Sequence, residues 1–153
     1  MERKANVRME DLLPLMNEVI QKGGKFRLTV TGNSMFPLFH ENRDSVILEK
    51  AEQIKKHDIL LYRRKDGQFV LHRVVQIKDG ILSFCGDNQL KIETPIERGQ
   101  VLARVTAFYR DGKLTELSRA WYRFYCLTWG NCIRLRPFFL VSYSRLCKIF
   151  HRN

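Results

Sequence analysis

The sequence predicts a mostly β protein: a small antiparallel β assembly with a short N-terminal helix and a helical C-terminal tail. Its 153 residues are enough for one domain with a short appendage. Between residues 25 and 117, β-like runs follow one another with turns rather than helices between them, which favours an antiparallel sheet over a parallel one. Asp66-Gly67 and Asp79-Gly80 lie between such runs and are typical of hairpin turns.

The elements follow in order along the chain. Residues 9–21 are expected to form a helix, because their apolar residues fall on one stripe and Gly23-Gly24 follow. Pro14 lies inside this stretch and is an alternative first turn. Strands are expected over residues 26–31, 45–49, 59–63, 69–76, 81–85 and 101–109. The chain thus divides into an N-terminal helical segment (1–24), a β domain (25–117) and a tail (118–153).

The tail differs from the rest of the chain in charge and in aromatic content. The whole chain carries 27 Lys and Arg against 16 Asp and Glu, a net charge of +11, yet no acidic residue follows Glu116. Aromatic and basic residues favour attachment to a membrane surface. The alternatives are a helix that packs on the β domain and a docking element for an acidic substrate or partner. No nucleic acid partner is expected, because no known binding motif accompanies the basic residues.

Composition also bears on the location of the protein. Residues 1–22 are charged and amphipathic, so no signal peptide is expected there. No window reaches the ~18 apolar residues of a spanning helix. The four cysteines form no C-x-x-C pair, so no zinc site is expected, and reduced thiols favour a cytosolic setting. We therefore expect a protein that is membrane-associated through its tail, or cytoplasmic.

Three short segments carry residues capable of nucleophilic catalysis. Ser34 stands beside Gly32 and before Pro37, His72 lies in a β-like run, and Asp87 lies in a Gly-Asp-Asn turn. A hydroxyl, an imidazole and a carboxylate can act as nucleophile, general base and orienting group. Each segment by itself is more often structural: a turn around Ser34 and Asp87, and a satisfied histidine on a strand.

Taken together, five segments resemble the superfamily of serine peptidases that contains signal peptidases and self-cleaving repressors. The resemblance covers about residues 26–105. The segments are Gly32-Asn33-Ser34-Met35-Phe36-Pro37, Asp44-Ser45-Val46-Ile47-Leu48, His57-Asp58-Ile59-Leu60-Leu61, Leu71-His72-Arg73-Val74-Val75 and Gly86-Asp87-Asn88. Glycine is usual before the Asp of the second and third segments, whereas Arg43 and His57 stand there in this chain, so local turn geometry is expected to differ.

The resemblance implies a signal-peptidase-like fold and a set of catalytic residues. Signal peptidase I and the repressors use a Ser-Lys pair, whereas the endoplasmic-reticulum type carries His at the Lys position. His72 at that position is similar to the Ser-His version. The resemblance then implies Ser34 as nucleophile, His72 as base, Asp87 as third member, and an oxyanion site at the Ser34 backbone N–H with Gly32 beside it. It implies no cofactor and no metal.

We therefore expect a serine endopeptidase that removes a leader or signal segment from a precursor polypeptide through an acyl-enzyme. Two alternatives stay open. One is a cytosolic processing peptidase for a small precursor peptide, with the tail as docking element. The other is a non-catalytic binding module on the same scaffold.

Overall fold

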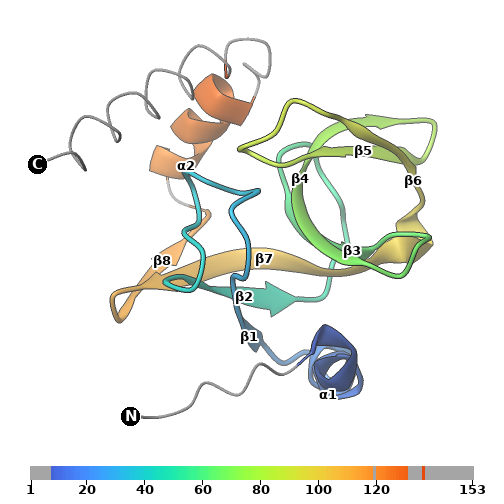
Figure 1. Ribbon diagram of the computed structural model, residues 1–153, viewed down its shortest axis with the longest axis vertical. Helices are drawn as coiled ribbons and strands as arrows, with labels where there is room; N and C mark the ends of the chain where they lie inside the picture. Colours follow the sequence, from blue (N-terminus) through green and yellow to red (C-terminus); the bar gives the residue numbers. More distant parts are fainter. Residues whose placement is uncertain (1–7, 119, 131–135, 137–153) are drawn as a thin grey trace, which may run out of the picture.

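The computed structural model describes residues 8–118, 120–130 and 136, and its β domain is flanked by two helical segments (Figure 1). Helix α1 (Met9–Gln21) comes first, and α2 (Ala120–Tyr125) continues into a π-helical turn, η2 (Cys126–Gly130). The strands between them are β1 (Phe26–Thr29), β2 (Ser45–Glu49), β3 (Ile59–Arg63), β4 (Phe69–Lys78), β5 (Ile81–Cys85), β6 (Glu93–Ile96), β7 (Val101–Arg110) and β8 (Lys113–Glu116). A 3₁₀ turn, η1 (Arg98–Gln100), precedes β7.

Eight strands form one antiparallel sheet within the described residues. The order is β1-β2-β7-β3-β4-β5-β6, and β8 pairs with the far end of β7. The long strand β7 joins two halves: its start pairs with β3, and its other edge pairs with β2. In Figure 1, β3 to β6 curl into a rounded half, β1 and β2 lie on the other side of β7, and β8 lies at the far end of β7, on the edge opposite β2. Because the sheet twists and curls, side chains on its two faces pack into separate interiors.

Two apolar clusters fill these faces. The larger one contains Met16 and Ile20 of α1, Met35 and Phe39 after β1, and apolar residues of β2, β3 and β7. The smaller one lies inside the curled half and is formed by Leu60, Tyr62, Val74, Leu82, Phe84 and Ile96. Alternate residues of β3 and β4 enter different clusters, as period-2 side-chain alternation requires. His72 shares its face with Val70 and Val74, so it belongs to the inner side of the curled half.

The mostly β fold class and both flanking helices are confirmed. Helix α1 has the expected bounds and contains Pro14 in its interior. Strands β2, β3 and β5 match the expected bounds, whereas β4 and β7 run slightly further and β1 ends earlier. Strands β6 and β8 were not predicted. Both have four residues, and β6 contains Pro95, which weakens any strand pattern. Most of the expected helical tail (118–153) lies outside the described residues.

Candidate active site

The loop that carries Ser34 joins β1 to β2 and is closed at its base by backbone hydrogen bonds. The Val30 N–H donates to the Asp44 carbonyl (3.0 Å), and the Asn42 N–H donates to the Val30 carbonyl (2.8 Å). The buried Asp44 carboxylate accepts from the His40 backbone (2.9 Å) and from Arg110 of β7. Burial acts to raise the pKa of Asp44, but the hydrogen bonds from Arg110 and His40 outweigh it and hold this pKa below its usual range. The second sequence segment therefore anchors the end of the Ser34 loop.

A second anchor is the turn of residues 86–89, which follows β5. The Asn88 N–H donates to the Ser34 carbonyl (2.8 Å), and the Asn88 side chain donates to the Asn33 carbonyl (3.2 Å). A Cβ at Gly86 would lie only 2.6 Å from the Ser34 carbonyl oxygen, so this approach requires glycine. The Gly-Asp-Asn segment thus fixes the backbone position of Ser34.

His72 lies on β4, buried, with one ring nitrogen held by two neighbours. Its Nδ1 is 3.3 Å from Glu93 Oε1 and 3.3 Å from the Tyr62 hydroxyl. Tyr62 donates its single hydroxyl hydrogen to Glu93 Oε2 (2.9 Å), so its oxygen can only accept from the imidazole. A carboxylate oxygen also only accepts. Nδ1 therefore carries the hydrogen of the neutral ring, and Nε2 keeps the lone pair that a general base needs.

Electrostatics keep this imidazole neutral and its carboxylate partner charged. Burial lowers the pKa of His72 to about 4, although the nearby Glu93 charge acts in the opposite direction. Burial acts to raise the pKa of Glu93, but hydrogen bonds from Arg64 and Tyr62 outweigh it and lower this pKa. Arg64 Nε donates to Glu93 Oε2 at 2.8 Å, and its second nitrogen contacts Oε1. At pH 7 the pair is thus a neutral histidine beside an ionised glutamate.

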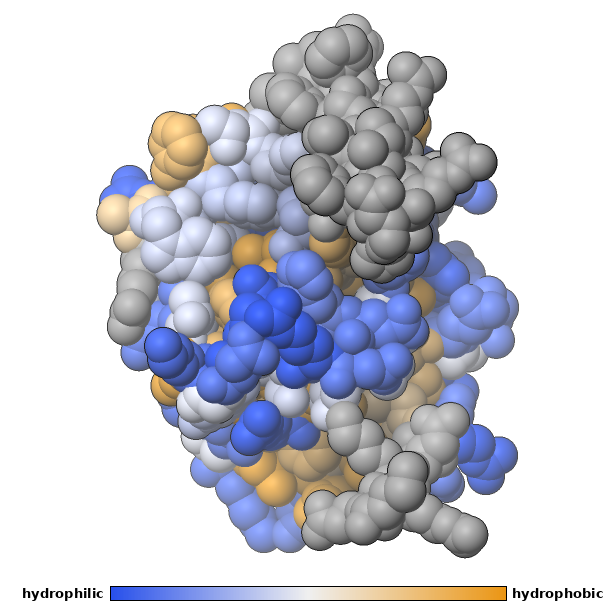
Figure 2. Space-filling model, turned by 60° about the vertical axis from the view of Figure 1, so that its left-hand side comes forward, coloured by the Kyte–Doolittle hydropathy of each residue, from blue (hydrophilic) through white to orange (hydrophobic). Residues whose placement is uncertain are grey.

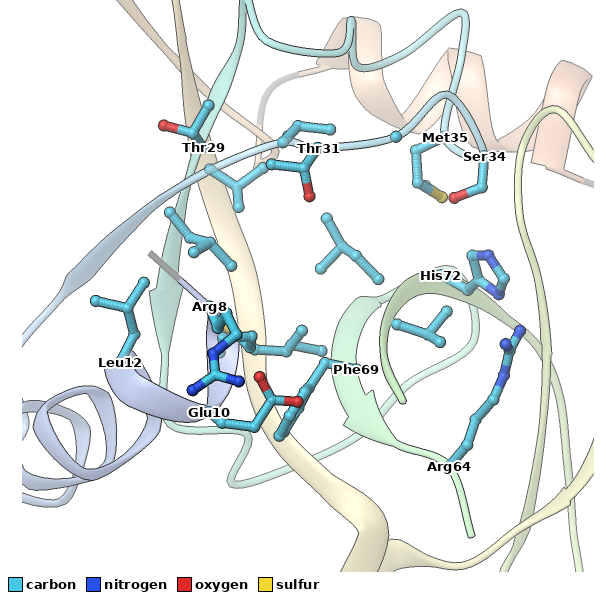
Figure 3. A pocket seen from close by; sticks show the side chains of 18 of the residues that line it. Arg8, Glu10, Leu12, Thr29, Thr31, Ser34, Met35, Arg64, Phe69 and His72 are labelled. Atoms are coloured by element: carbon cyan, nitrogen blue, oxygen red, sulfur yellow. The ribbon is translucent and has the colours of Figure 1, made fainter. Parts of the chain in front are cut away.

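Ser34 and His72 line one pocket of about 690 Å³. Figure 3 shows their side chains entering this space from the loop after β1 and from β4, with Arg64 on the far side of the imidazole. Among the described residues no hydrogen bond joins the Ser34 hydroxyl to His72, a looseness common in sites without substrate. The Ser34 backbone N–H also has no partner among these residues, and a Cβ at Gly32 would meet open space.

The carboxylate of Asp87 has other partners than His72. It is fully buried and accepts two hydrogen bonds from Arg73, Nε to Oδ1 at 2.8 Å and a terminal nitrogen to Oδ2 at 2.7 Å. The Tyr125 hydroxyl also donates to Oδ2 (2.9 Å). Arg73 follows His72 on β4 and points to the opposite side of the strand. The structure thus brings Ser34 and His72 to one pocket and places Asp87 behind it, on the Arg73 side.

Sequence reasoning missed Glu93, Tyr62 and Arg64, which surround the imidazole. Glu93 is the first residue of β6, so the failure to predict that strand removed it from consideration. For Tyr62 the sequence held one indication. The expected β3–β4 hairpin pairs Leu60 with His72, and Tyr62 lies on the same face of β3 as Leu60, so its side chain could have been expected near the imidazole.

Comparison with known proteins identifies the family of the chain. The family model described as Peptidase S24-like matches residues 2–106, which include Ser34, His72, Asp87 and Glu93. Searches of curated proteins and of solved structures returned no significant match. The match ends within β7 and leaves β8, α2 and Arg136 outside. Because it covers more than half of the chain, and because the mostly β architecture agrees with it, the chain belongs to the Peptidase S24-like family, within the serine peptidase superfamily that its motifs resemble.

Proposed function

We propose that this protein is a serine endopeptidase of the Ser-His type. One observation carries the proposal: a neutral imidazole, held at Nδ1 by Glu93 and Tyr62, shares a pocket with Ser34. A histidine that served packing alone would not need an ionised carboxylate at one nitrogen while the other is left for the pocket. This arrangement favours an enzyme over a non-catalytic binding module on the same scaffold.

The proposed reaction proceeds through an acyl-enzyme. Ser34 Oγ attacks the carbonyl carbon of the scissile bond while His72 Nε2 takes the hydroxyl proton. The Ser34 backbone N–H donates to the oxyanion that forms. The imidazolium then gives its proton to the leaving amine, and a water molecule, activated by the same nitrogen, hydrolyses the ester.

In this proposal Glu93 and Asp87 support catalysis in different ways. Glu93 stabilises the imidazolium and fixes the ring, because its oxygen lies 3.3 Å from Nδ1. Asp87 acts on Ser34 instead: it neutralises the buried Arg73 and belongs to the turn that holds the Ser34 carbonyl. The role of third catalytic residue, which the resemblance implied for Asp87, stays a prediction, and the contacts between Glu93 and His72 favour Glu93 over Asp87 for that role.

The substrate we propose is an extended precursor polypeptide with an apolar side chain near the cleavage site. The pocket beside Ser34 is lined by apolar side chains of β1, β3 and β4, among them Leu28, Leu61 and Val70, and by Val30 just after β1. Strand β1 pairs with β2 on one edge only, so its other edge offers backbone groups to a peptide. A leader or signal segment of another protein fits this description. A small cytosolic precursor peptide is the second candidate, and the location of the enzyme separates the two.

We further propose that the C-terminal part of the protein contacts an anionic membrane surface. On α2 and η2 the side chains of Trp121, Phe124 and Leu127 are exposed, with Phe124 69% exposed. Figure 2 brings this side forward and shows pale and orange surface at the upper left, above a blue hydrophilic band. Aromatic side chains favour the interface, and basic residues attract anionic lipid. In the part of the chain that the structure describes, no helix is long and apolar enough to cross a bilayer.

The experiment that tests the peptidase proposal uses a proteome-derived peptide library and mass spectrometry of new termini. The wild-type protein should produce cleavages that are absent with Ser34→Ala and with His72→Ala. Because the two residues act as a unit, the double variant should be no worse than either single variant. Ser118→Ala, an exposed serine outside the pocket, is the matched control and should cleave like the wild type. Cleavage that survives in Ser34→Ala would refute the proposal.

A further inference from the structure

The turn of residues 86–89 lies between the Ser34 loop and a segment from the C-terminal part of the chain. On one side, the Asn88 N–H and side chain donate to the carbonyls of Ser34 and Asn33. On the other side, the turn's own carbonyls accept hydrogen bonds from two residues far along the chain, Trp129 and Arg136. The turn thus connects the backbone of the Ser34 loop to the C-terminal segment.

The contacts on the C-terminal side are numerous and buried. Arg136 is only 1% exposed and donates from one nitrogen to the carbonyls of Gly86 (2.8 Å) and Gln89 (3.2 Å). Its Nε and its other terminal nitrogen donate to the Trp129 carbonyl (3.3 and 3.2 Å). The Trp129 indole N–H donates to the Asp87 carbonyl (3.0 Å). Arg136 also donates to Cys85 Sγ (3.7 Å) and lies 3.7 Å from the Asp87 carboxylate. A buried guanidinium that donates mainly to backbone carbonyls fixes their geometry at a cost in desolvation, which indicates a positioning role.

The same segment also reaches the strand that carries His72. Arg73 donates from one nitrogen to the Tyr122 hydroxyl (2.8 Å) and to Cys126 Sγ (3.3 Å). Its other donors hold the Asp87 carboxylate, which also accepts from Tyr125. One helical segment therefore contacts both the support of Ser34 and the neighbour of His72.

We propose that the C-terminal clamp, defined as residues 120–130 together with Arg136, positions Ser34 against His72 and is required for full activity. The inference rests on the proposed peptidase function. The family match ends at residue 106, so the clamp lies outside the matched region. Arg136 is the positioning residue at its centre, because its donors join Trp129 to the turn that holds Ser34.

The test compares Arg136→Met with Arg123→Met. Both changes replace a guanidinium by an apolar chain, but the Arg123 side chain is exposed on α2 and makes no hydrogen bond or ion pair within the described residues. The first readout is amide hydrogen exchange at Asn88, whose N–H bonds to the Ser34 carbonyl and needs no substrate. We expect exchange about tenfold faster in Arg136→Met and unchanged in Arg123→Met, because loss of the clamp opens the turn locally.

The second readout separates positioning from general stability. In Arg136→Met, kcat measured well below the unfolding temperature should fall about 10- to 100-fold while KM changes little, since only the reacting geometry is lost. If Arg136→Met fails to fold, Tyr125→Phe removes a single hydroxyl from Asp87 and should give the same pattern with a smaller amplitude. Unchanged Asn88 exchange, or an unchanged kcat in folded Arg136→Met, would overturn the proposal. A wild-type protein without peptidase activity would refute the proposed function, and the exchange rates would still decide whether the clamp holds the turn.

Discussion

Gly86→Ala should damage catalysis more than any other single-methyl change outside the catalytic residues. The new Cβ would lie 2.6 Å from the Ser34 carbonyl oxygen, whereas ordinary contact begins at 3.4 Å. Both atoms belong to backbone segments, so no side-chain rotation relieves the clash. The Ser34 loop must move by about 0.8 Å, and the Asn88–Ser34 hydrogen bond lengthens with it. A displacement near 1 Å costs about 100-fold in rate, or about 2.7 kcal/mol of transition-state stabilisation.

The assay measures kcat and KM on one cleaved peptide, together with the free energy of unfolding in urea. We expect kcat to fall about 100-fold and stability to fall by about 1–3 kcal/mol, since overpacking also strains the fold. Gly99→Ala is the matched control: a Cβ there meets nothing within 4 Å, so both quantities should stay near wild type. Gly32→Ala, equally open, should keep stability and raise KM if a substrate passes close to that backbone. A folded Gly86→Ala protein with kcat within twofold of wild type would refute the proposed positioning of Ser34.

Four further outcomes are expected. Since the pKa of His72 is lowered to about 4, kcat/KM should be flat between pH 8 and 6 and fall only as the pH drops through about 4; an inflection at 6.5 would contradict the burial of the imidazole. Between pH 6.5 and about 4, His72 binds more protons in the unfolded chain than in the folded protein. The free energy of unfolding should therefore decrease as the pH drops from 6.5 towards 4. Glu93→Gln should lower kcat on the order of 10²–10⁴-fold. Asp87→Asn should leave residual activity but cost about 3–5 kcal/mol of stability, because the buried Arg73 guanidinium loses its charged partner. Equal effects of the two variants on kcat would contradict the division of roles. Co-sedimentation with anionic vesicles should weaken as salt rises and when residues 137–153 are removed. It should be absent with neutral vesicles. A supernatant fraction that does not depend on lipid charge would exclude the proposed binding to an anionic membrane surface.

The sequence predicted the strands best where local chemistry decides them. Strands β3 and β4 are joined by an Asp-Gly turn and match or nearly match their expected bounds, because hairpin turns and alternating apolar residues act over a few neighbours. Strand β6 is held in place by β5 through only two residue pairs and contains Pro95, so nothing local marks it. This unpredicted strand carries Glu93, so only Asp87, through the resemblance, stood as a candidate partner of His72.

Long-range contacts account for the rest of what the sequence could not predict. Strand alternation places His72 and Arg73 on opposite sides of β4, but it does not indicate that Arg73 bonds to Asp87 and Tyr122 there. The composition of the tail favours a membrane element, with packing on the β domain as an alternative. Its described part packs on the domain through Tyr122, Tyr125 and Trp129, and such contacts depend on the fold rather than on local pattern.

One departure from the superfamily pattern has a visible structural correlate. His57 stands where a glycine is usual before the third-segment Asp, and it adopts a φ of 77°, in the left-handed region. A non-glycine residue in this region costs about 1–3 kcal/mol. The Tyr122 hydroxyl and Arg73 both donate to the His57 carbonyl, which holds this conformation. The expectation that this departure concerns turn geometry rather than chemistry fits these contacts.

Capture of the acyl-enzyme tests the central claim, that Ser34 is a nucleophile served by His72. The protein is incubated with an activated ester of an acyl group from a cleaved peptide, quenched in acid and mapped by mass spectrometry. We predict one added acyl group on Ser34 in the wild type, none in Ser34→Ala, and formation at least about 10³-fold slower in His72→Ala. An adduct on another residue, or acylation of Ser34 at the same rate without His72, would contradict the account.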